Sequence, residues 1–296
     1  MNFTTLKKQL IQAKITAKIA VAQAEGEEIF TALKAASDEN LCFPILVGNP
    51  EKIAAAVKHF DLRKFAVIEA VDSVEAASRA VQAVREHQAD LLMKGNLSTD
   101  ILLKAVLHKT EGLRTGSLLS HLAVFETAKN KFLGITDGGI NINPDLKAKV
   151  SIINNAVGLF HKLGIAEPCV AILSAIEKVN PDMPSTMDAA ALVDMANHGE
   201  IKGAKVAGPV AFDLAVSAHA RQVKNFTACH EDADIIIAPE IVCGNAVSKA
   251  LVYVAQSRSG GVILGAACPI ILLSRSDSAA EKFNSIVLGI SACATF

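Results

Sequence analysis

The sequence predicts an α/β protein made of two α/β domains with a cleft between them. Short apolar runs alternate with helical patterns along the 296 residues, which is the order of a parallel-rich sheet covered by helices. Hydrophobic residues make up 51% of the chain and aromatic residues only 4%, so Ala, Val, Ile and Leu are expected to fill the core. We expect about ten strands, which is more than one twisted sheet holds comfortably, and this number favours two sheets.

Four strand–helix pairs are expected before residue 109. Glu25 leads the first helix, since acidic residues suit the positive end of a helix dipole. Pro50 opens the second, because its missing N–H costs nothing in a first turn. A Ser-Thr-Asp run at 98–100 caps the fourth. The expected strands are 18–22, 43–48, 65–68 and 91–93, and the expected helices are 25–36, one from 50, 73–86 and 101–108.

The rest of the chain continues the same alternation. Lys- and Asn-rich residues separate its first two strands, and Asp137-Gly138-Gly139 forms a turn after them. Pro144 starts the next helix. The expected strands are 122–125, 132–136, 170–173, one centred on 206, 235–238, 262–264 and 270–273, and the expected helices are 144–163, 186–196, 213–223, 245–256 and 278–291.

Charge, hydropathy and cysteine spacing exclude several classes of protein. Lys and Arg total 29 against 30 Asp and Glu, a balance that argues against a nucleic-acid partner. The most apolar stretch, 262–273, is shorter than the roughly 20 residues of a membrane-spanning helix. Lysines at 7, 8, 14 and 18 interrupt any signal peptide, so a cytoplasmic location is expected. No two of the six cysteines form a C-x-x-C pair, and reduced, mostly buried thiols are expected.

The common nucleotide and zinc motifs are missing. The sequence has no G-x-G-x-x-G after a strand, no G-x-x-x-x-G-K-[ST] and no H-E-x-x-H. It therefore gives no direct support for NAD binding, P-loop hydrolysis or a zinc protease.

Basic and hydroxyl residues stand instead at several expected strand ends. Lys94 ends one strand, and Ser98 and Thr99 begin the next helix, where free N–H groups attract anions. The alternative is an ordinary turn with a polar cap. Arg114 and Thr115 lie beside Gly116, where a guanidinium could hold phosphate with two hydrogen bonds, although a solvated loop arginine would look the same.

His121 lies on the strand that follows Arg114. A single His on an apolar strand is more often a hydrogen-bonded core residue than a catalytic group.

A third polar group, Ser274 to Ser278, follows an apolar strand directly. Ligands of open α/β sheets bind beyond the carboxyl ends of strands. Ser274 could donate a hydrogen bond there, Arg275 could hold an anion, and Asp277 could cap the helix or act as a base. The alternative is a polar helix cap with an incidental arginine.

Five motifs occur in an order that resembles the phosphate acetyltransferase/phosphate butyryltransferase family, closer to the butyryl branch. The resemblance covers residues 18–290. The motifs are L-M-K-G at 92–95, G-L-R-T-G at 112–116 with L-S-H at 119–121, V-N-P-D-M-P-S-T at 179–186, G-P-V-A-F-D at 208–213 and L-S-R-S-D-S at 273–278.

The resemblance implies a reaction and a fold. The reaction is acyl-CoA + phosphate ⇌ acyl phosphate + CoA, with a butyryl or similar short acyl group. The fold is like that of the isocitrate/isopropylmalate dehydrogenases, with the active site in the cleft. Residues 1–125 with 262–296 would form the first domain, and residues 126–261 the second.

The resemblance also implies roles for the polar strand ends. Ser274 would stabilise the oxyanion, and Arg275, Arg114 or Lys94 would hold phosphate. A carboxylate must take the proton of the CoA thiol, whose pKa is near 8.5 like that of free Cys, and either Asp277 or Glu281 could do so. The acetyl branch has its catalytic Asp seven residues after the Ser, where this chain has Glu281. No metal or redox cofactor is required, and the partners are acyl-CoA, phosphate and acyl phosphate.

Two other functions and one assembly state complete the expectations. A metal- and NAD-dependent dehydrogenase of the same fold would need acidic ligands, for which Asp213, Asp232 and Asp234 are the candidates. A non-catalytic CoA-binding protein is the other alternative.

The mean hydropathy of +0.36 predicts exposed apolar surface and hence a homodimer.

Overall fold

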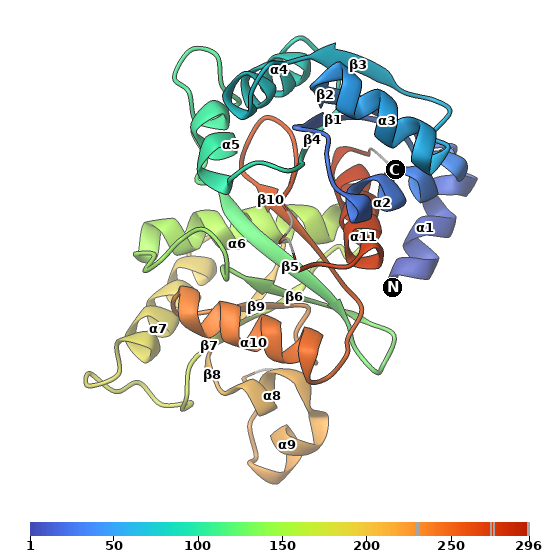
Figure 1. Cartoon of the computed structure of the whole chain (residues 1–296). Helices are drawn as coiled ribbons and strands as arrows, with labels where there is room; N and C mark the ends of the chain where they lie inside the picture. The colour runs from blue at the N-terminus through green and yellow to red at the C-terminus, as the bar shows by residue number, and fades with distance from the viewer. Residues whose placement is uncertain (229–230, 273, 275, 295–296) are drawn as a thin grey trace. The chain divides into compact units, whose positions relative to one another are not determined.

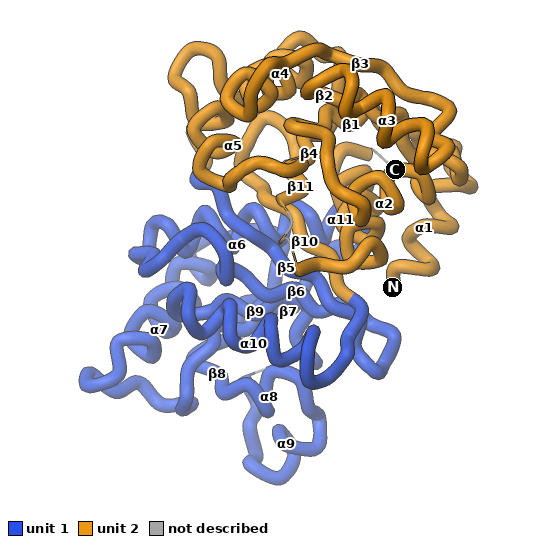
Figure 2. The backbone as a smooth tube through the Cα atoms, viewed as in Figure 1, with its two compact units in different colours: residues 1, 118–258 blue, residues 2–117, 259–296 orange. Residues whose placement is uncertain are grey.

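A computed structural model describes residues 1–228, 231–272, 274 and 276–294 (Figure 1). The chain divides into two compact units: unit 1 contains Met1 and residues 118–258, and unit 2 contains residues 2–117 and 259–296 (Figure 2). The domain boundaries expected from the sequence, 1–125 with 262–296 and 126–261, stay a prediction.

Unit 2 holds strands in the order β3-β2-β1-β4-β11-β10. Neighbouring strands run parallel except β10 and β11, which are antiparallel. β1 is central and almost wholly buried, which explains its apolar composition. The strands are β1 (Ala17–Ala22), β2 (Cys42–Gly48), β3 (Ala66–Glu69), β4 (Leu91–Lys94), β10 (Ser259–Leu264) and β11 (Ile270–Ile271).

Polar side chains cap several helices of unit 2, and the cap expected at 98–100 is Ser98. Asn49, Asp72, Ser98 and Ser278 each accept a backbone N–H through the side chain. α11 packs against α2 and β10, so the first turns of two helices face the same part of the unit (Figure 1). The helices are α1 (Phe3–Gln12), α2 (Glu27–Asp38), α3 (Pro50–Phe60), α4 (Ser73–Arg85), α5 (Thr99–Val106) and α11 (Ala279–Cys293).

Unit 1 holds strands in the order β5-β6-β9-β7-β8. β5 and β6 form an antiparallel hairpin, and the remaining pairs are parallel, so the sheet of the protein is mixed. The strands are β5 (Ser120–Glu126), β6 (Phe132–Thr136), β7 (Cys169–Leu173), β8 (Lys205–Val210) and β9 (Ile235–Ile237).

The helices of unit 1 differ from the expected ones in two places. The single helix expected over 213–223 is two helices, because Ser217 leaves helical geometry and caps the second through Ala220 N. The helix expected from 245 begins earlier, because Glu240 accepts the N–H groups of Val242 and Cys243. The helices are α6 (Leu146–Lys162), α7 (Pro184–Asn197), α8 (Phe212–Val216), α9 (Ala218–Val223) and α10 (Ile241–Tyr253).

No helix among the described residues is both long and apolar enough to cross a membrane.

Candidate active site

Lys94 is the last residue of β4, and its side chain is buried. Its Nζ donates to the carbonyl oxygens of Gly95, at 3.3 Å, and Leu97, at 2.9 Å. Gly95 allows the chain to turn here, since a Cβ at that position would lie 2.0 Å from the Gln23 carbonyl oxygen. The strand end is therefore packed tightly around a buried cation.

Ser98 and Thr99 follow this turn. Ser98 Oγ accepts the backbone N–H of Ile101 at 3.4 Å, and Thr99 is the first residue of α5. The hydroxyl of Ser98 thus serves as a helix cap, which is the simpler of the two roles that the sequence allows.

Ser274 stands on the turn that leads from β11 to α11. Its backbone N–H donates to Asp277 Oδ2 at 2.7 Å, and the Asp277 N–H donates to the Ser274 carbonyl at 3.2 Å. The exposed Ser274 Oγ lies 2.9 Å from Ser276 Oγ. Arg275 lies outside the described residues.

Glu281 takes part in the N-terminal cap of α11. It forms a capping box with Ser278, whose N–H and Oγ both donate to Glu281 Oε2, at 2.8 and 2.9 Å. Its other oxygen accepts Ser259 Oγ at 3.2 Å. Both oxygens of this carboxylate therefore have structural partners, whereas Asp277 lies on the Ser274 turn itself.

Lys94 and Ser274 line one pocket of about 160 Å³ in unit 2. They meet because β4 and β11 are adjacent parallel strands, with Met93 beside Ile271, so their carboxyl ends share one edge. The structure thus brings together two polar strand ends that the sequence places 180 residues apart. The other lining residues are Glu25, Gly26, Glu28, Ile29, Gly95, Asn96 and Lys282.

Glu25, which lies just before the first residue of α2, contributes a carboxylate to this pocket. Burial alone would raise its pKa, but hydrogen bonds from Lys52, Gln23 and Asn96 outweigh burial and hold the pKa below the usual value. The three donors lie 3.1, 2.6 and 3.4 Å from the carboxylate oxygens. Glu25 is therefore ionised and already well satisfied.

The sequence did not single out Glu25, Asn96 or Lys282 as site residues. Glu25 could have been found, because it follows the central strand and the same strand-end rule applies to it. Lys282 gives no such signal, since a lysine in a helix usually faces solvent.

Arg114 and Thr115 belong to unit 2 but lie outside the residues that line this pocket. Arg114 is exposed and forms a short antiparallel bridge with Ala266. Thr115 Oγ1 donates to the Gly265 carbonyl at 2.7 Å, which ties the two segments together.

His121 belongs to unit 1, where it lies half-buried on β5. Its backbone N–H donates to the buried carboxylate of Asp137 at 3.1 Å. The same carboxylate accepts the N–H groups of Gly139, at 2.7 Å, and Ile140, at 2.9 Å. The sequence predicted a turn at 137–139, and these hydrogen bonds show that the Asp137 side chain stabilises it.

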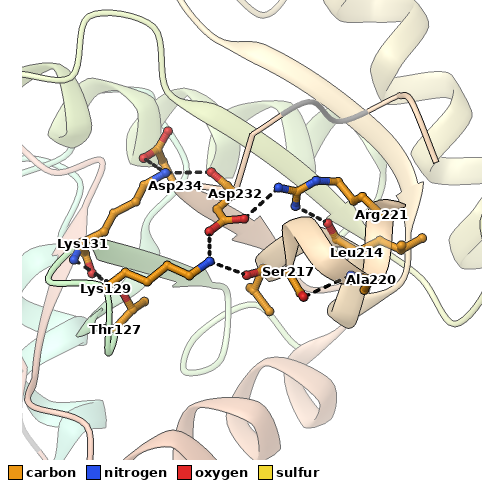
Figure 3. Close-up of polar contacts among 10 residues, drawn as sticks. Thr127, Lys129, Lys131, Leu214, Ser217, Ala220, Arg221, Asp232 and Asp234 are labelled. Carbon is orange, nitrogen blue, oxygen red and sulfur yellow. Dashed lines mark hydrogen bonds and ion pairs between the residues drawn. The ribbon is translucent and has the colours of Figure 1, made fainter. Parts of the chain in front are cut away.

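The three acidic residues proposed as metal ligands are bound to basic side chains instead. Figure 3 shows two of them, Asp232 and Asp234. Asp232 pairs with Lys129 and, at 2.8 Å, with Arg221, and Lys131 lies 2.9 Å from Asp234. Burial alone would raise the pKa of Asp232, but hydrogen bonds from both cations outweigh it and lower that pKa.

Asp213 pairs with Lys224 at 2.9 Å, and this hydrogen bond lowers the pKa of Asp213. Within 1–228, 231–272, 274 and 276–294, no group of three His, Cys, Asp or Glu side chains could hold a metal. The acidic set thus holds unit 1 together, and the dehydrogenase alternative is not favoured.

Known proteins match this chain over almost its whole length. A family described as phosphate acetyl/butaryl transferase matches residues 64–290. A phosphate butyryltransferase of Clostridium acetobutylicum is 41% identical, with 94% of each chain covered. A branched-chain phosphotransacylase structure from Enterococcus faecalis V583 matches with a TM-score of 0.85 and 31% identity, covering 94% of this chain and 99% of that one.

These matches, together with the pocket at the strand ends, define a phosphate acyltransferase. The chain belongs to the phosphate acetyl/butaryl transferase family, as its five ordered motifs indicate.

The predicted likeness to isocitrate/isopropylmalate dehydrogenases is wrong. The fold is an α/β fold with a large mixed sheet that matches phosphotransacylases, including a phosphotransacetylase structure from Streptococcus pyogenes with a TM-score of 0.79 at 18% identity. The short motifs carry information about local turns, while the strand order depends on long-range pairing that they do not encode. The antiparallel β5–β6 and β10–β11 pairs are the part of that pairing that a simple βα alternation misses.

Proposed function

We propose that this protein transfers a short acyl group between CoA and inorganic phosphate, in the reaction acyl-CoA + phosphate ⇌ acyl phosphate + CoA. The observation that carries the proposal is the pocket in which Lys94 meets Ser274, in a chain that belongs to the phosphate acyltransferases. A buried ammonium beside an exposed hydroxyl suits an anion that leaves a carbonyl carbon.

In the proposed mechanism Asp277 takes the proton of the CoA thiol. The resulting thiolate attacks the carbonyl carbon of the acyl phosphate, and Ser274 donates a hydrogen bond to the oxyanion. The C–O bond to phosphate then breaks, and phosphate leaves to the cations Lys94 and Arg275. Asp277 is chosen over Glu281 for two reasons. Asp277 accepts the backbone N–H of Ser274, whereas Glu281 is engaged in the capping box of α11.

We extend the proposed substrate-binding set to Arg114, Thr115, His121, Ser98 and Thr99. Arg114 and Thr115 follow α5, the helix that Ser98 caps, and the backbone N–H of His121 donates to Asp137 in unit 1. No cofactor besides the two substrates takes part in the proposed reaction.

We expect thiol release from acyl-CoA to require phosphate, or arsenate in its place, and to proceed with a chelator and without NAD. Saturated acyl chains of about three to five carbons should be preferred, because the five motifs resemble the butyryl branch of the family and one methylene is worth about 1–3 kcal/mol in a pocket. The measurement is kcat/KM for acetyl-, propionyl-, butyryl- and valeryl-CoA in a thiol-reagent assay.

Two outcomes of this assay would count against the proposal at different levels. No phosphate-dependent thiol release with any chain would contradict acyl transfer. Release that is fastest with acetyl-CoA would contradict only the butyryl assignment.

We also propose that the protein is a cytoplasmic homodimer and that α10 lies in its interface. α10 is rich in apolar residues, and it packs Cys243, Val247 and Leu251 against the core of unit 1, yet Gly244 is its one fully buried residue. Val242, Tyr253 and Val254, at its two ends, are 69%, 59% and 82% exposed. The cytoplasmic location is supported by the five described cysteines, all of which are free thiols.

Light scattering should therefore give twice the chain mass of 31.1 kDa. Val254→Glu should produce a species of 31.1 kDa, because a carboxylate would have to be desolvated in the interface. Val71→Glu is the matched control, since Val71 is 80% exposed but lies in unit 2, and it should leave the dimer intact. A wild-type protein that is monomeric at micromolar concentration would refute the dimer.

A further inference from the structure

His121 lies opposite Asp137 at one edge of the unit 1 strands. β5 and β6 pair antiparallel, with Ala123 beside Ile135. Continuing this register by two residues sets His121 against Asp137. β6 also runs parallel to β9, so Asp137, which follows β6, lies at the carboxyl edge of the parallel strands. Ligands of open α/β sheets bind beyond that edge. The half-buried His121 therefore stands where unit 1 would meet a ligand.

N–H donors of the following turn surround the carboxylate of Asp137. Its Oδ1 accepts the backbone N–H groups of Gly139 and Ile140, at 2.7 and 2.9 Å. Its Oδ2 accepts the His121 N–H at 3.1 Å, and the side-chain and backbone N–H groups of Asn141 at 2.6 and 3.4 Å. A carboxylate offers about four acceptor sites, so these bonds use all of them. Asp137 is thus an anchor for the backbone and leaves no acceptor site for a substrate.

The turn is also held from two other sides. Asn141 Nδ2 donates to the Leu119 carbonyl at 2.8 Å, which ties the turn to the residue before β5. α10 packs against the turn, since a Cβ at Gly244 would lie 2.4 Å from the Asp137 carbonyl oxygen. Asn245 Nδ2, also on α10, donates to a carbonyl of the turn at 3.0 Å. The start of β5 and the end of β6 are therefore fixed to each other by side chains and close backbone contacts.

Gly139 lies against the His121 ring. A Cβ at Gly139 would lie 3.0 Å from His121 Cγ and 3.2 Å from its Cβ and Nδ1, and these are the three nearest atoms. Carbon atoms in contact normally lie about 3.5–4.0 Å apart, so the ring would have to move. Gly139 does not have the left-handed φ that demands glycine. The missing Cβ therefore serves the imidazole and not the backbone.

We infer that Gly139, Asp137 and Asn141 are positioning residues for the His121 imidazole, which contacts a bound substrate. Gly139 leaves the space in which the ring lies, and the other two fix the backbone from which it projects. A ring held in place loses little conformational freedom when the substrate binds. An imidazole has an N–H donor whether it is neutral or charged, so it can bind an oxygen of acyl-CoA or of phosphate. The inference rests on the proposed function, to which it adds these three residues.

A double-mutant cycle separates positioning of the ring from support of the fold. Isothermal titration of the full-length protein measures the binding of CoA and of inorganic phosphate, and the thiol-release assay gives KM for acyl-CoA and for phosphate. Gly139→Ala should weaken the binding of one substrate at least threefold and raise its KM more than it lowers kcat, because the added methyl group displaces the ring. His121→Ala should weaken the same substrate. Gly139→Ala should then have no further effect in the His121→Ala background, because the displaced ring is absent.

Gly158→Ala is the matched control. Gly158 is an exposed glycine of the same unit, and a Cβ there would meet no atom within 4 Å beyond its own helix, so both affinities should stay unchanged. Asn141→Ala is a second test, because it removes the side-chain donors of the turn, and its effect should also vanish without the His121 ring. The inference is overturned if Gly139→Ala alters neither affinity and neither KM, or if its effect persists in full in the His121→Ala background.

The failure of this inference differs from the failure of the proposed function. Coupling of Gly139 to His121 in ligand binding, in a protein without phosphate-dependent thiol release, would keep the positioning role and contradict acyl transfer. Thiol release with purely additive effects of the two substitutions would do the reverse.

Discussion

Arg275→Ala is expected to reduce kcat/KM for acyl transfer by about a hundredfold or more, which corresponds to about 3 kcal/mol of transition-state stabilisation. Arg275 directly follows Ser274, at the end of an apolar strand, where the sequence offers it no structural partner. A guanidinium holds phosphate with two parallel hydrogen bonds as the C–O bond to phosphate breaks. Lysine lacks this planar fork, so Arg275→Lys should recover little of the activity.

The unfolding midpoint should change little in either Arg275 variant, because neither substitution removes core volume. Arg63→Ala is a suitable control, since Arg63 is an exposed arginine of the same unit that pairs with Asp61. Steady-state kinetics with butyryl-CoA and phosphate measure the effect. An Arg275→Ala rate within threefold of wild type would remove Arg275 from the proposed site and leave the family assignment intact.

Apolar periodicity and helix-start residues such as Pro50 predicted most of the secondary structure because these signals are local. Asn49, Asp72 and Ser278 begin helices where their side chains can accept backbone N–H groups, and the apolar runs between helices became strands. The N-terminal helix α1 was not predicted. Phe3, Leu6 and Leu10 show helical spacing, and all three are buried.

Site residues were predictable only where they directly follow a strand, because ligands of open α/β sheets bind beyond the carboxyl ends of strands. Lys94 and Ser274 each follow an apolar strand, and the adjacency of those strands makes them neighbours. Lys282 could not be found in this way, because helical periodicity alone does not show that its ammonium group turns back to the Asp277 carbonyl. The prediction of a dehydrogenase-like fold was wrong for a related reason, since strand order is set by contacts between distant segments.

The choice between the two candidate bases is where the structure adds most to the sequence. Both carboxylates lie within seven residues of Ser274, so spacing alone allows either. The hydrogen bonds separate them, since Glu281 closes a capping box while Asp277 Oδ2 accepts the Ser274 N–H. Glu281 accepts hydrogen bonds on both oxygens, from Ser278 in the helix cap and from Ser259 on β10. Such a carboxylate is a poor base, because taking a proton would cost it one of those bonds.

Asp277→Asn should therefore lower kcat about a hundredfold or more, the lower end of the contribution of a general base. An asparagine keeps an oxygen that can accept the Ser274 N–H, so the turn should persist and the loss should come from the missing base. The acidic limb of the pH–kcat profile, which reports titration of the base, should disappear with it. Stopped assays with butyryl-CoA and phosphate across the pH range provide both readouts.

Glu281→Gln is the matched comparison, because glutamine also closes a capping box. We expect its kcat to stay within about threefold of wild type and its stability to fall by no more than about 1 kcal/mol, the usual range for a changed cap. If Glu281→Gln proves the more damaging substitution and abolishes the acidic limb, Glu281 is the base and the Ser278 cap must open during the reaction. If neither variant alters the pH profile, the thiol loses its proton to another group, and the role proposed for the Ser274–Asp277 turn is wrong.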